Sequence, residues 1–277
     1  MRVAQDKLRE RIHQDLLNLV DNTLADAEIG PGIKKLLSAL GVTVDELKKE
    51  VLAYTLAKGV SEYHNDQYQK NVARLTLYFH NLVRGTYHRR RHEFVSAFLN
   101  RIKPKTLMDV GFGVPGPYLL PYLQNNPGAT AILADQDPSA EDTARVIMSS
   151  INPELLKQVK FIVYDMNTQE YPGDVEAYLH LDSVEHTKNP TEYLRKMVRA
   201  ARLGSHFIFS IPVCSMKGLE GFHYYEWLTD VEVLKWLEEA GLFIKDSGAA
   251  IPNFAVDYFV ELVEGGYHNF MVLAQKI

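Results

Sequence analysis

Cysteine is almost absent from this sequence. The 277 residues contain one cysteine, Cys214, so no disulfide can form within the chain. Secreted domains often depend on such bridges, and the composition therefore favours a reducing compartment; we expect a cytoplasmic protein. Because no basic residue adjoins Cys214 in the sequence to activate its thiol, we expect this residue to have a structural role.

Long apolar runs are missing as well. No stretch approaches the roughly 18 apolar residues that a membrane-spanning helix needs. Residues 1–14 are rich in charge and contain no apolar segment, so we expect no signal peptide. These features predict a protein without a membrane partner.

The sequence also lacks an excess of positive charge. It has 30 Lys and Arg residues against 35 Asp and Glu residues, which gives a net charge of −5. Nucleic-acid binders usually need a basic surface, so we expect no nucleic-acid partner. The one basic run, residues 88–92, is interpreted as the solvated start of a helix; the alternative is a clamp for an anionic substrate.

Helical patterns fill the first hundred residues. Apolar residues recur at helical spacing over 5–27, and further helices are predicted over 33–40, 44–58 and 66–100, with a break near Gly85. Thr43 stands three residues before Glu46, a capping-box pattern that marks a helix start. We expect residues 1–100 to form a helical cap for substrate recognition, serving either as a lid or as the interface of a homodimer.

Strand and helix patterns alternate in residues 101–277, which we treat as a second region. Strands are predicted over 106–110, 130–134, 159–164, 175–181, 206–211 and 268–275. Helices are predicted over 116–125, 139–150, 190–202 and from a cap at Thr229 to near Gly241. This alternation predicts an α/β fold: a mostly parallel sheet with helices on both faces and a ligand at the carboxyl ends of the strands.

A glycine motif follows the first predicted strand and opens a helix. It runs Asp109-Val-Gly111-Phe112-Gly113-Val-Pro-Gly116, and glycines at such a turn let the backbone approach a ligand closely. Asp135 ends the next strand, where a carboxylate can accept hydrogen bonds from both hydroxyls of a ribose. These features alone fit a nicotinamide dinucleotide equally well.

Three further features favour a ligand other than a nicotinamide dinucleotide. Asp109 directly precedes the glycine turn, where it suits an ammonium group and would repel a pyrophosphate. Asp165 and Met166 follow the third strand and could hold an adenine amino group and ring. The fourth strand ends in a polar cluster, residues 181–186, at the place where chemistry is expected.

Residues 104–212 resemble the class I methyltransferases that use S-adenosyl-L-methionine. Residues 109–116 resemble the family's first motif, Asp135 its ribose-binding acid, and residues 183–194 and 202–212 its later motifs. Two departures, Val114-Pro115 and Gly204-Ser205, affect local loop shape. The resemblance implies a Rossmann-like sheet of seven strands with the last one antiparallel. The cofactor-binding residues that it implies are Asp109, Gly111, Phe112, Gly113, Gly116, Asp135, Gln136, Asp165, Met166, Leu181 and Asp182.

The resemblance predicts methyl transfer to O, N or C of a small molecule, in secondary metabolism or cofactor biosynthesis. Catalytic and pocket candidates share the regions after the fourth and fifth strands: Glu185, His186, His223 and Tyr224. Further aromatic and histidine candidates lie in the helical region: Tyr63, His64, Tyr68, Tyr78, His80 and Tyr87. No metal is expected, although Asp182, Glu185 and His186 resemble a divalent-cation trio of ubiquinone-biosynthesis O-methyltransferases.

Three alternatives remain at this point. A protein or nucleic-acid methyltransferase is one, although no Asn/Asp-Pro-Pro-Tyr/Phe motif follows the fourth strand and residues 181–183 stand in its place. A nicotinamide-dependent oxidoreductase is the second, and Asp109 disfavours it. The third is a binding module that keeps the fold without transferring a group.

Overall fold

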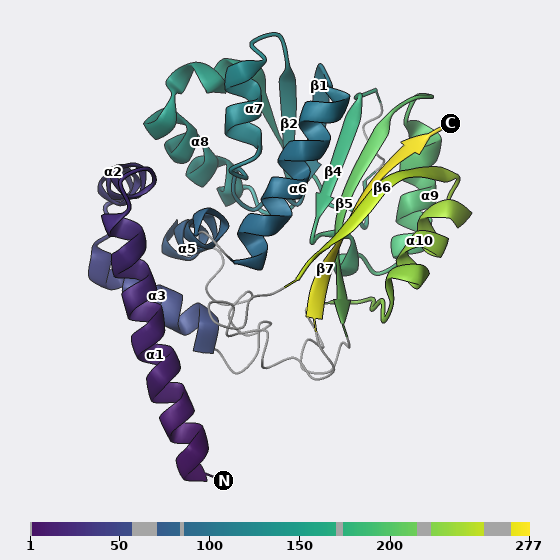
Figure 1. Ribbon diagram of the computed structural model, residues 1–277. Helices are drawn as coiled ribbons and strands as arrows, with labels where there is room; N and C mark the ends of the chain where they lie inside the picture. Colours follow the sequence, from purple (N-terminus) through teal and green to yellow (C-terminus); the bar gives the residue numbers. More distant parts are fainter. Residues whose placement is uncertain (1, 57–70, 84–85, 170–173, 215–222, 252–266) are drawn as a thin grey trace.

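The computed structural model describes residues 2–56, 71–83, 86–169, 174–214, 223–251 and 267–277 (Figure 1). Helices make up its first part: α1 (Arg2–Ala25), α2 (Gly30–Leu40), α3 (Val44–Leu56), α5 (Asn71–Leu82) and α6 (Tyr87–Ile102). The strands are β1 (Thr106–Val110), β2 (Thr130–Asp135), β3 (Val159–Val163), β4 (Ala177–Leu181), β5 (His206–Cys214), β6 (Leu242–Ala250) and β7 (Tyr267–Lys276). Between them lie α7 (Leu119–Asn125), α8 (Ser139–Ile151), α9 (Pro190–Ala200), α10 (Asp230–Glu239) and two short 3-10 helices, η1 (Pro153–Gln158) and η2 (Val184–His186).

The seven strands form one sheet in the order β3-β2-β1-β4-β5-β7-β6. The pairs from β3 to β5 are parallel, whereas β7 runs antiparallel to both β5 and β6. The strand order reverses between β1 and β4, and such a switch point is where open α/β sheets bind ligands. The predicted fold class is confirmed, including the antiparallel last strand.

Helices cover both faces of the sheet. Side chains alternate along β1, so Leu107 joins one buried apolar cluster while Met108 and Val110 join the other. The first cluster includes residues of α6, α7 and α8 and extends into α1, α2, α3 and α5; the second includes residues of α9 and α10. The N-terminal helices therefore share a continuous core with one face of the sheet, while α1 extends away from it (Figure 1).

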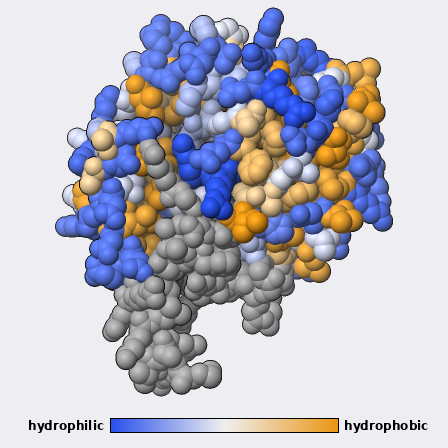
Figure 2. Space-filling view, viewed as in Figure 1, coloured by the Kyte–Doolittle hydropathy of each residue, from blue (hydrophilic) through white to orange (hydrophobic). Residues whose placement is uncertain are grey.

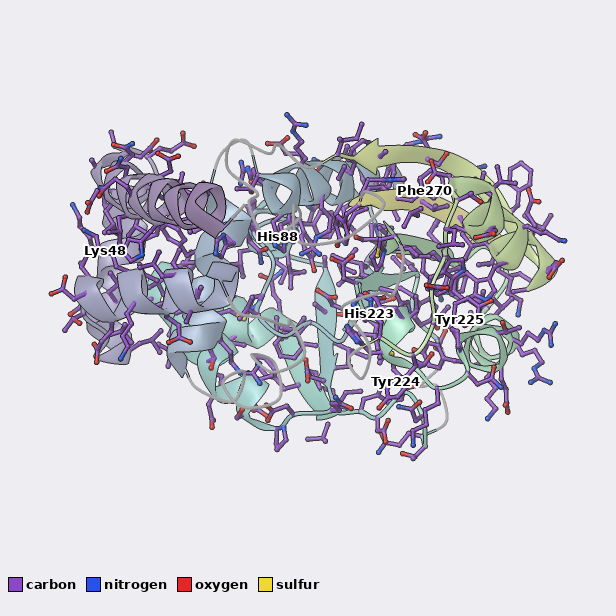
Figure 3. The ribbon with its side chains drawn as sticks, turned by 90° about the horizontal axis from the view of Figure 1, so that it is seen from below. Lys48, His88, His223, Tyr224, Tyr225 and Phe270 are labelled. Atoms are coloured by element: carbon purple, nitrogen blue, oxygen red, sulfur yellow. The ribbon has the colours of Figure 1, made fainter. Side chains whose placement is uncertain are left out.

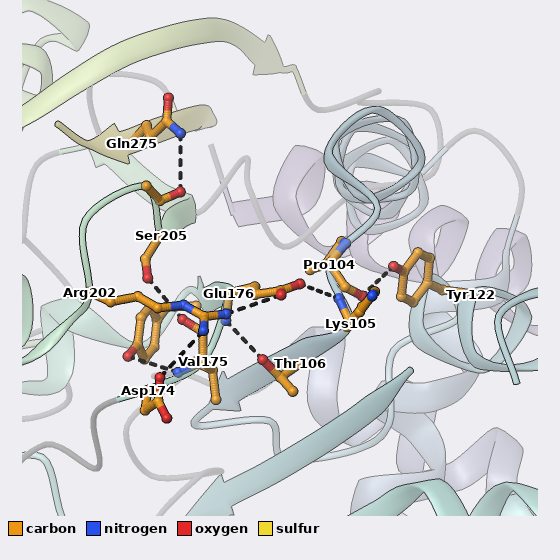
Figure 4. A network of polar contacts seen from close by, with 12 residues as sticks. Pro104, Lys105, Thr106, Tyr122, Asp174, Val175, Glu176, Arg202, Ser205 and Gln275 are labelled. Carbon is orange, nitrogen blue, oxygen red and sulfur yellow. Dashed lines mark hydrogen bonds and ion pairs between the residues drawn. The ribbon is translucent and has the colours of Figure 1, made fainter. Parts of the chain in front are cut away.

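Polar contacts join the amino ends of three strands (Figure 4). The backbone N–H of Glu176 donates to Oγ1 of Thr106 at 3.0 Å, and its carboxylate lies 3.1 Å from the Arg202 guanidinium. The Ser205 hydroxyl donates to the Val175 carbonyl at 2.9 Å. These groups hold β1, β4 and β5 together at the edge opposite to their carboxyl ends.

One strand and several boundaries differ from the sequence predictions. The strand β6 was not predicted, because it lies at the sheet edge with Lys245 and Asp246 exposed, and a bulge between Ile244 and Asp246 shifts its register. The helix predicted from residue 116 begins at Leu119. The predicted caps at Thr43 and Thr229 are confirmed.

The outer surface is mixed in character. Figure 2 shows hydrophilic residues over much of the visible face, with more hydrophobic residues toward the side where β6, β7 and α10 lie. Within the described part of the chain, no helix is both long and apolar enough to cross a membrane.

The expected break near Gly85 concerns a residue outside the described ranges, but α5 and α6 on either side of it are separate helices.

Candidate active site

The glycine motif forms the loop between β1 and α7. Gly111 and Gly113 have φ angles of +69° and +54°, and a Cβ at Gly111 would lie 2.9 Å from Cβ of Ser183. Position 111 therefore requires glycine, because the loop passes against the segment that follows β4. Phe112 packs against Phe161 of β3, with ring centroids 6.3 Å apart. The loop thus lies over the carboxyl ends of the central strands.

Asp109 lies on β1 below this loop and is 1% exposed. The hydroxyl of Tyr118 donates a hydrogen bond to its carboxylate, and His92 of α6 stacks on the Tyr118 ring at 5.1 Å. A Cβ at Gly116 would lie 1.9 Å from that ring, so this glycine makes room for Tyr118. Burial raises the pKa of Asp109 to about 7, although the Tyr118 hydrogen bond and the charge of Arg91 both lower it.

Asp135 ends β2, and the exposed Gln136 follows it. Its carboxylate accepts hydrogen bonds from the backbone N–H groups of Gly113 and Asp137, each at 2.9 Å. Burial raises the pKa of Asp135, and these two hydrogen bonds partly oppose the shift. A carboxylate has lone pairs for about four hydrogen bonds, so Asp135 can accept more donors while it joins the two loops.

Arg74 of α5 reaches the same two loops, and the sequence analysis did not single it out. This fully buried guanidinium donates to the Gly113 carbonyl at 2.7 Å and to the Asp137 carboxylate at 2.6 Å. Burial raises the pKa of Asp137, but hydrogen bonds from Ser139 and the charge of Arg74 outweigh burial and lower it. The sequence signal that could have identified Arg74 is its helical spacing. It stands four residues before Tyr78 and therefore on the same buried face of the helix.

Asp165 and Met166 follow β3, next to the buried Tyr164. The Asp165 carboxylate accepts hydrogen bonds from the Asn167 N–H at 2.8 Å and the Thr168 hydroxyl at 3.0 Å. These bonds lower the pKa of Asp165 and hold its turn in place. Tyr164 and Met166 line a cavity of about 600 Å³ that continues along α9.

Asp182 follows Leu181 at the end of β4 and has a φ angle of +51°. Arg91 of α6 forms an ion pair with its Oδ2. The Ser210 hydroxyl donates to Oδ1 at 2.5 Å, and the side-chain amide of Asn269 donates to the same oxygen. Asp182 therefore joins α6 to β4, β5 and β7 at the carboxyl edge of the sheet.

The basic run at the start of α6 is not a solvated helix start. His88, Arg91 and His92 are 4–6% exposed, and of the five residues in the run only Arg90 is classed as exposed. The reason is that α6 lies against the sheet, where helical periodicity turns these three residues inward. Burial lowers the pKa of His88 and His92 well below the usual value, which favours the neutral form of both rings.

Three of the four catalytic candidates bring their side chains together. Glu185 and His186 lie in η2, and one nitrogen of His223 lies with their donor atoms in a group spanning at most 4.8 Å. The imidazole rings of His186 and His223 are 4.9 Å apart at 73°. The backbone N–H of Tyr224 donates to the Glu185 carbonyl at 2.8 Å, while Tyr224 itself is 55% exposed.

The cation trio suggested by the sequence is not formed. Asp182 is held by Arg91, Ser210 and Asn269, and among the described residues the group that could hold a metal ion is Glu185, His186 and His223. Burial raises the pKa of Glu185 well above its usual value, and the nearby charge of Asp182 adds to this shift.

The remaining candidates have mixed outcomes. Tyr63, His64 and Tyr68 lie outside the described residues, as does the side chain of Tyr87. Tyr78 and His80 are buried in the helical part, and burial lowers the pKa of His80 to about 4. Cys214 is buried at the end of β5, and burial raises the pKa of its thiol to about 12. This shift supports a structural role, because the reactive form of cysteine is the thiolate.

Comparisons with known proteins identify the fold. No family model matches the sequence, and no curated protein matches it. Among solved structures, the N-methyltransferase NodS from Bradyrhizobium japonicum WM9, in complex with S-adenosyl-L-homocysteine, is 12% identical with a TM-score of 0.53, over 71% of this chain and 90% of NodS. An O-methyltransferase family protein from Burkholderia thailandensis is 13% identical with a TM-score of 0.54, over 88% of this chain and 72% of that one. The chain has the class I methyltransferase fold.

A further similar structure is named for a reaction other than methyl transfer. The [4+2]-cyclase SpnF is 15% identical with a TM-score of 0.55, over 70% of this chain and 83% of SpnF. The methyltransferase fold therefore hosts more than one kind of reaction, and function has to be argued from the site. In this chain the cofactor candidates gather at the carboxyl ends of β1, β2, β3 and β4.

Proposed function

We propose that this protein transfers a methyl group from S-adenosyl-L-methionine to an O, N or C atom of a small molecule in a biosynthetic pathway. One observation carries the proposal. Asp109, Asp135 and Asp165 follow one another along the carboxyl edge of a sheet with the methyltransferase fold, beside a loop with two glycines at positive φ. NodS, which shares the fold, was solved with the demethylated cofactor.

The residues at this edge fit the parts of the cofactor. Asp109 would hold the ammonium group, Asp135 the ribose hydroxyls, and Asp165 with Met166 the adenine. Carboxylates suit the first two tasks because an ionised carboxylate only accepts hydrogen bonds. The remaining contacts are assigned to the neighbouring loop and strand ends: Gly111, Phe112, Gly113, Gly116, Gln136, Leu181 and Asp182.

The reaction asks mainly for positioning. The bound cofactor would supply a methyl group that its sulfonium makes electrophilic, and the protein must orient the acceptor and exclude water. We assign to the group formed by Glu185, His186 and His223 the task of promoting loss of the acceptor's proton. The exposed Tyr224 would line the way in, and residues 1–100 would act as the substrate-recognition region over residues 101–277.

A small-molecule acceptor is favoured over a macromolecule. The net charge of −5 disfavours nucleic acid, and the buried Arg91 is paired with Asp182. NodS is named as an N-methyltransferase and the Burkholderia protein as a member of an O-methyltransferase family.

Competing ligands test the proposal directly. Calorimetric titrations of the full chain with S-adenosylhomocysteine, reduced nicotinamide dinucleotide and a short RNA at moderate salt would be compared. We expect saturable binding of the first alone, followed by turnover in a screen of small acceptors. Binding of the nicotinamide nucleotide or RNA instead would overturn the proposal. Cofactor binding without any transfer would point to a non-methylating reaction, as the name of SpnF indicates for that protein.

A further inference from the structure

The side chains of Glu185, His186 and His223 come from two segments held together by their backbones. Glu185 and His186 form η2 directly after β4, and His223 lies beyond the end of β5. The hydrogen bond from the Tyr224 N–H to the Glu185 carbonyl, 2.8 Å long, fixes the second segment against the first. Figure 3 places His223 nearer the middle of the molecule than Tyr224 and Tyr225. The three donor groups therefore meet because of the backbone arrangement.

Glu185 is the unusual member of this group. It is 1% exposed, and neither of its carboxylate oxygens has a hydrogen-bond partner on another of the described residues. Nε2 of His186 lies 3.8 Å from Oε1 of Glu185, which is too far for a hydrogen bond. Buried carboxylates are normally paired, hydrogen-bonded or bound to a metal, so this side chain lacks a partner that the site should supply.

Arg91 does not fill that place. It forms an ion pair with Asp182, whose other oxygen accepts hydrogen bonds from Ser210 and Asn269. The same network explains why Asp182 is not a fourth member of the group. Within the described part of the chain, a cation for Glu185 would therefore be a protonated histidine or a bound ion.

We propose that Glu185, His186 and His223 bind a divalent transition-metal ion, with Zn²⁺ as the representative. Two imidazoles and one carboxylate form the donor set of open zinc and non-haem iron sites, whereas Mg²⁺ and Ca²⁺ prefer oxygen ligands throughout. At metal–ligand distances of about 2.0–2.1 Å, donor atoms in a tetrahedral site stand roughly 3.3 Å apart. The present donor atoms lie within 4.8 Å of one another, so small side-chain rotations would close the site.

The partial exposure of the two histidines leaves room for a further ligand. His186 and His223 are both half-buried, while Glu185 is buried. An acceptor hydroxyl could occupy the open position, where the ion would lower the hydroxyl's pKa; the proton would leave to solvent and the electron pair would stay on oxygen. The action of the ion on the acceptor hydroxyl rests on the proposed methyl transfer, and in it His186 acts as a metal ligand. Binding of the ion itself does not depend on methyl transfer.

Metal titration tests the site without any substrate. Chelator-treated full chain would be titrated with Zn²⁺ by calorimetry and with Co²⁺ by visible absorption, which reports tetrahedral coordination. We expect one ion per chain at micromolar affinity or tighter. Glu185→Gln and His223→Ala should each weaken binding at least about tenfold and alter the Co²⁺ spectrum. The His268→Ala variant is the matched control, since His268 lies 2.6 Å from the Asp230 carboxylate and outside the group.

The outcomes separate the site from the proposed function. No stoichiometric binding by the wild type, or equal affinity in all variants, would overturn the metal site even if S-adenosylhomocysteine binds. Circular dichroism of each variant shows whether lost binding reflects lost folding, and the wild-type Co²⁺ spectrum decides the case if both variants unfold. Metal binding with the expected pattern but no cofactor binding would keep the site and refute the methyltransferase proposal.

Discussion

The charge of Asp109 depends on its surroundings, which bring its pKa to about 7. It is buried, it accepts a hydrogen bond from Tyr118, and the charges of Arg91 and Asp135 act on it in opposite directions. The balance puts its pKa at about 7. A group that holds an ammonium ion must be ionised, so cofactor binding should follow the titration of this carboxyl.

We therefore predict that the affinity for S-adenosylhomocysteine rises about tenfold between pH 6 and pH 8, because the ionised fraction of a group with a pKa near 7 rises by that factor. The ligand's amino group stays protonated over this range. Calorimetry at several pH values measures the effect. In Asp109→Asn the affinity should be weaker and independent of pH. A pH-independent wild type would show that Asp109 does not hold the ammonium group.

Residues differ in how far the sequence alone could predict them. The positions of Asp109 and Asp135 follow from local patterns, since each belongs to a strand and the turn after it. Arg74 and Arg91 could not be placed in this way, because their partners Gly113 and Asp182 lie 39 and 91 residues away. Contacts at such separations depend on how α5 and α6 pack, which no local pattern encodes.

At the level of elements, α5 and α6 support the candidate site from the helical region. The Arg74 guanidinium connects α5 to the loops after β1 and β2, and Arg91 connects α6 to the end of β4. The basic run of α6 predicts a solvated helix start, and the single arginine of α5 gives no sign of a buried role. In both helices charge suggests exposure unless the packing of the helix is known.

Replacing Arg74 should weaken both the fold and the site. In Arg74→Met the Gly113 carbonyl and the Asp137 carboxylate lose a buried partner, so we expect about 3 kcal/mol less stability and about tenfold weaker binding of S-adenosylhomocysteine. Urea unfolding and calorimetry measure the two effects.

The control is Arg101→Met in the neighbouring helix α6. This change removes a half-exposed ion pair in which the Arg101 guanidinium lies 2.6 Å from the Asp246 carboxylate. Exposed pairs contribute little, so this change should alter stability by less than about 1 kcal/mol and leave binding unchanged. Equal effects of the two substitutions would contradict the special role of Arg74.

At the level of the whole molecule, the alternation of strands and helices was enough to predict the parallel sheet and the edge at which the candidate site is proposed. It was not enough to predict β6, whose exposed and bulged residues lack a strand pattern. The packing of α1, α2, α3 and α5 on one another and, through α6 and α8, on one side of the sheet also depends on the whole fold.

The central claim is that the carboxyl edge of this sheet binds S-adenosyl-L-methionine through Asp135. The most direct measurement is a calorimetric cycle with S-adenosylhomocysteine and its 2′,3′-dideoxy analogue, titrated into the wild type, Asp135→Ala and the control Asp246→Ala. We predict micromolar binding to the wild type and the control, and at least about tenfold weaker binding to Asp135→Ala. In Asp135→Ala, removing the ribose hydroxyls from the ligand should cause little further loss of affinity, because the protein change and the ligand change remove the same contact. Additive losses would refute the ribose contact, and no binding of S-adenosylhomocysteine to the wild type would contradict the account as a whole.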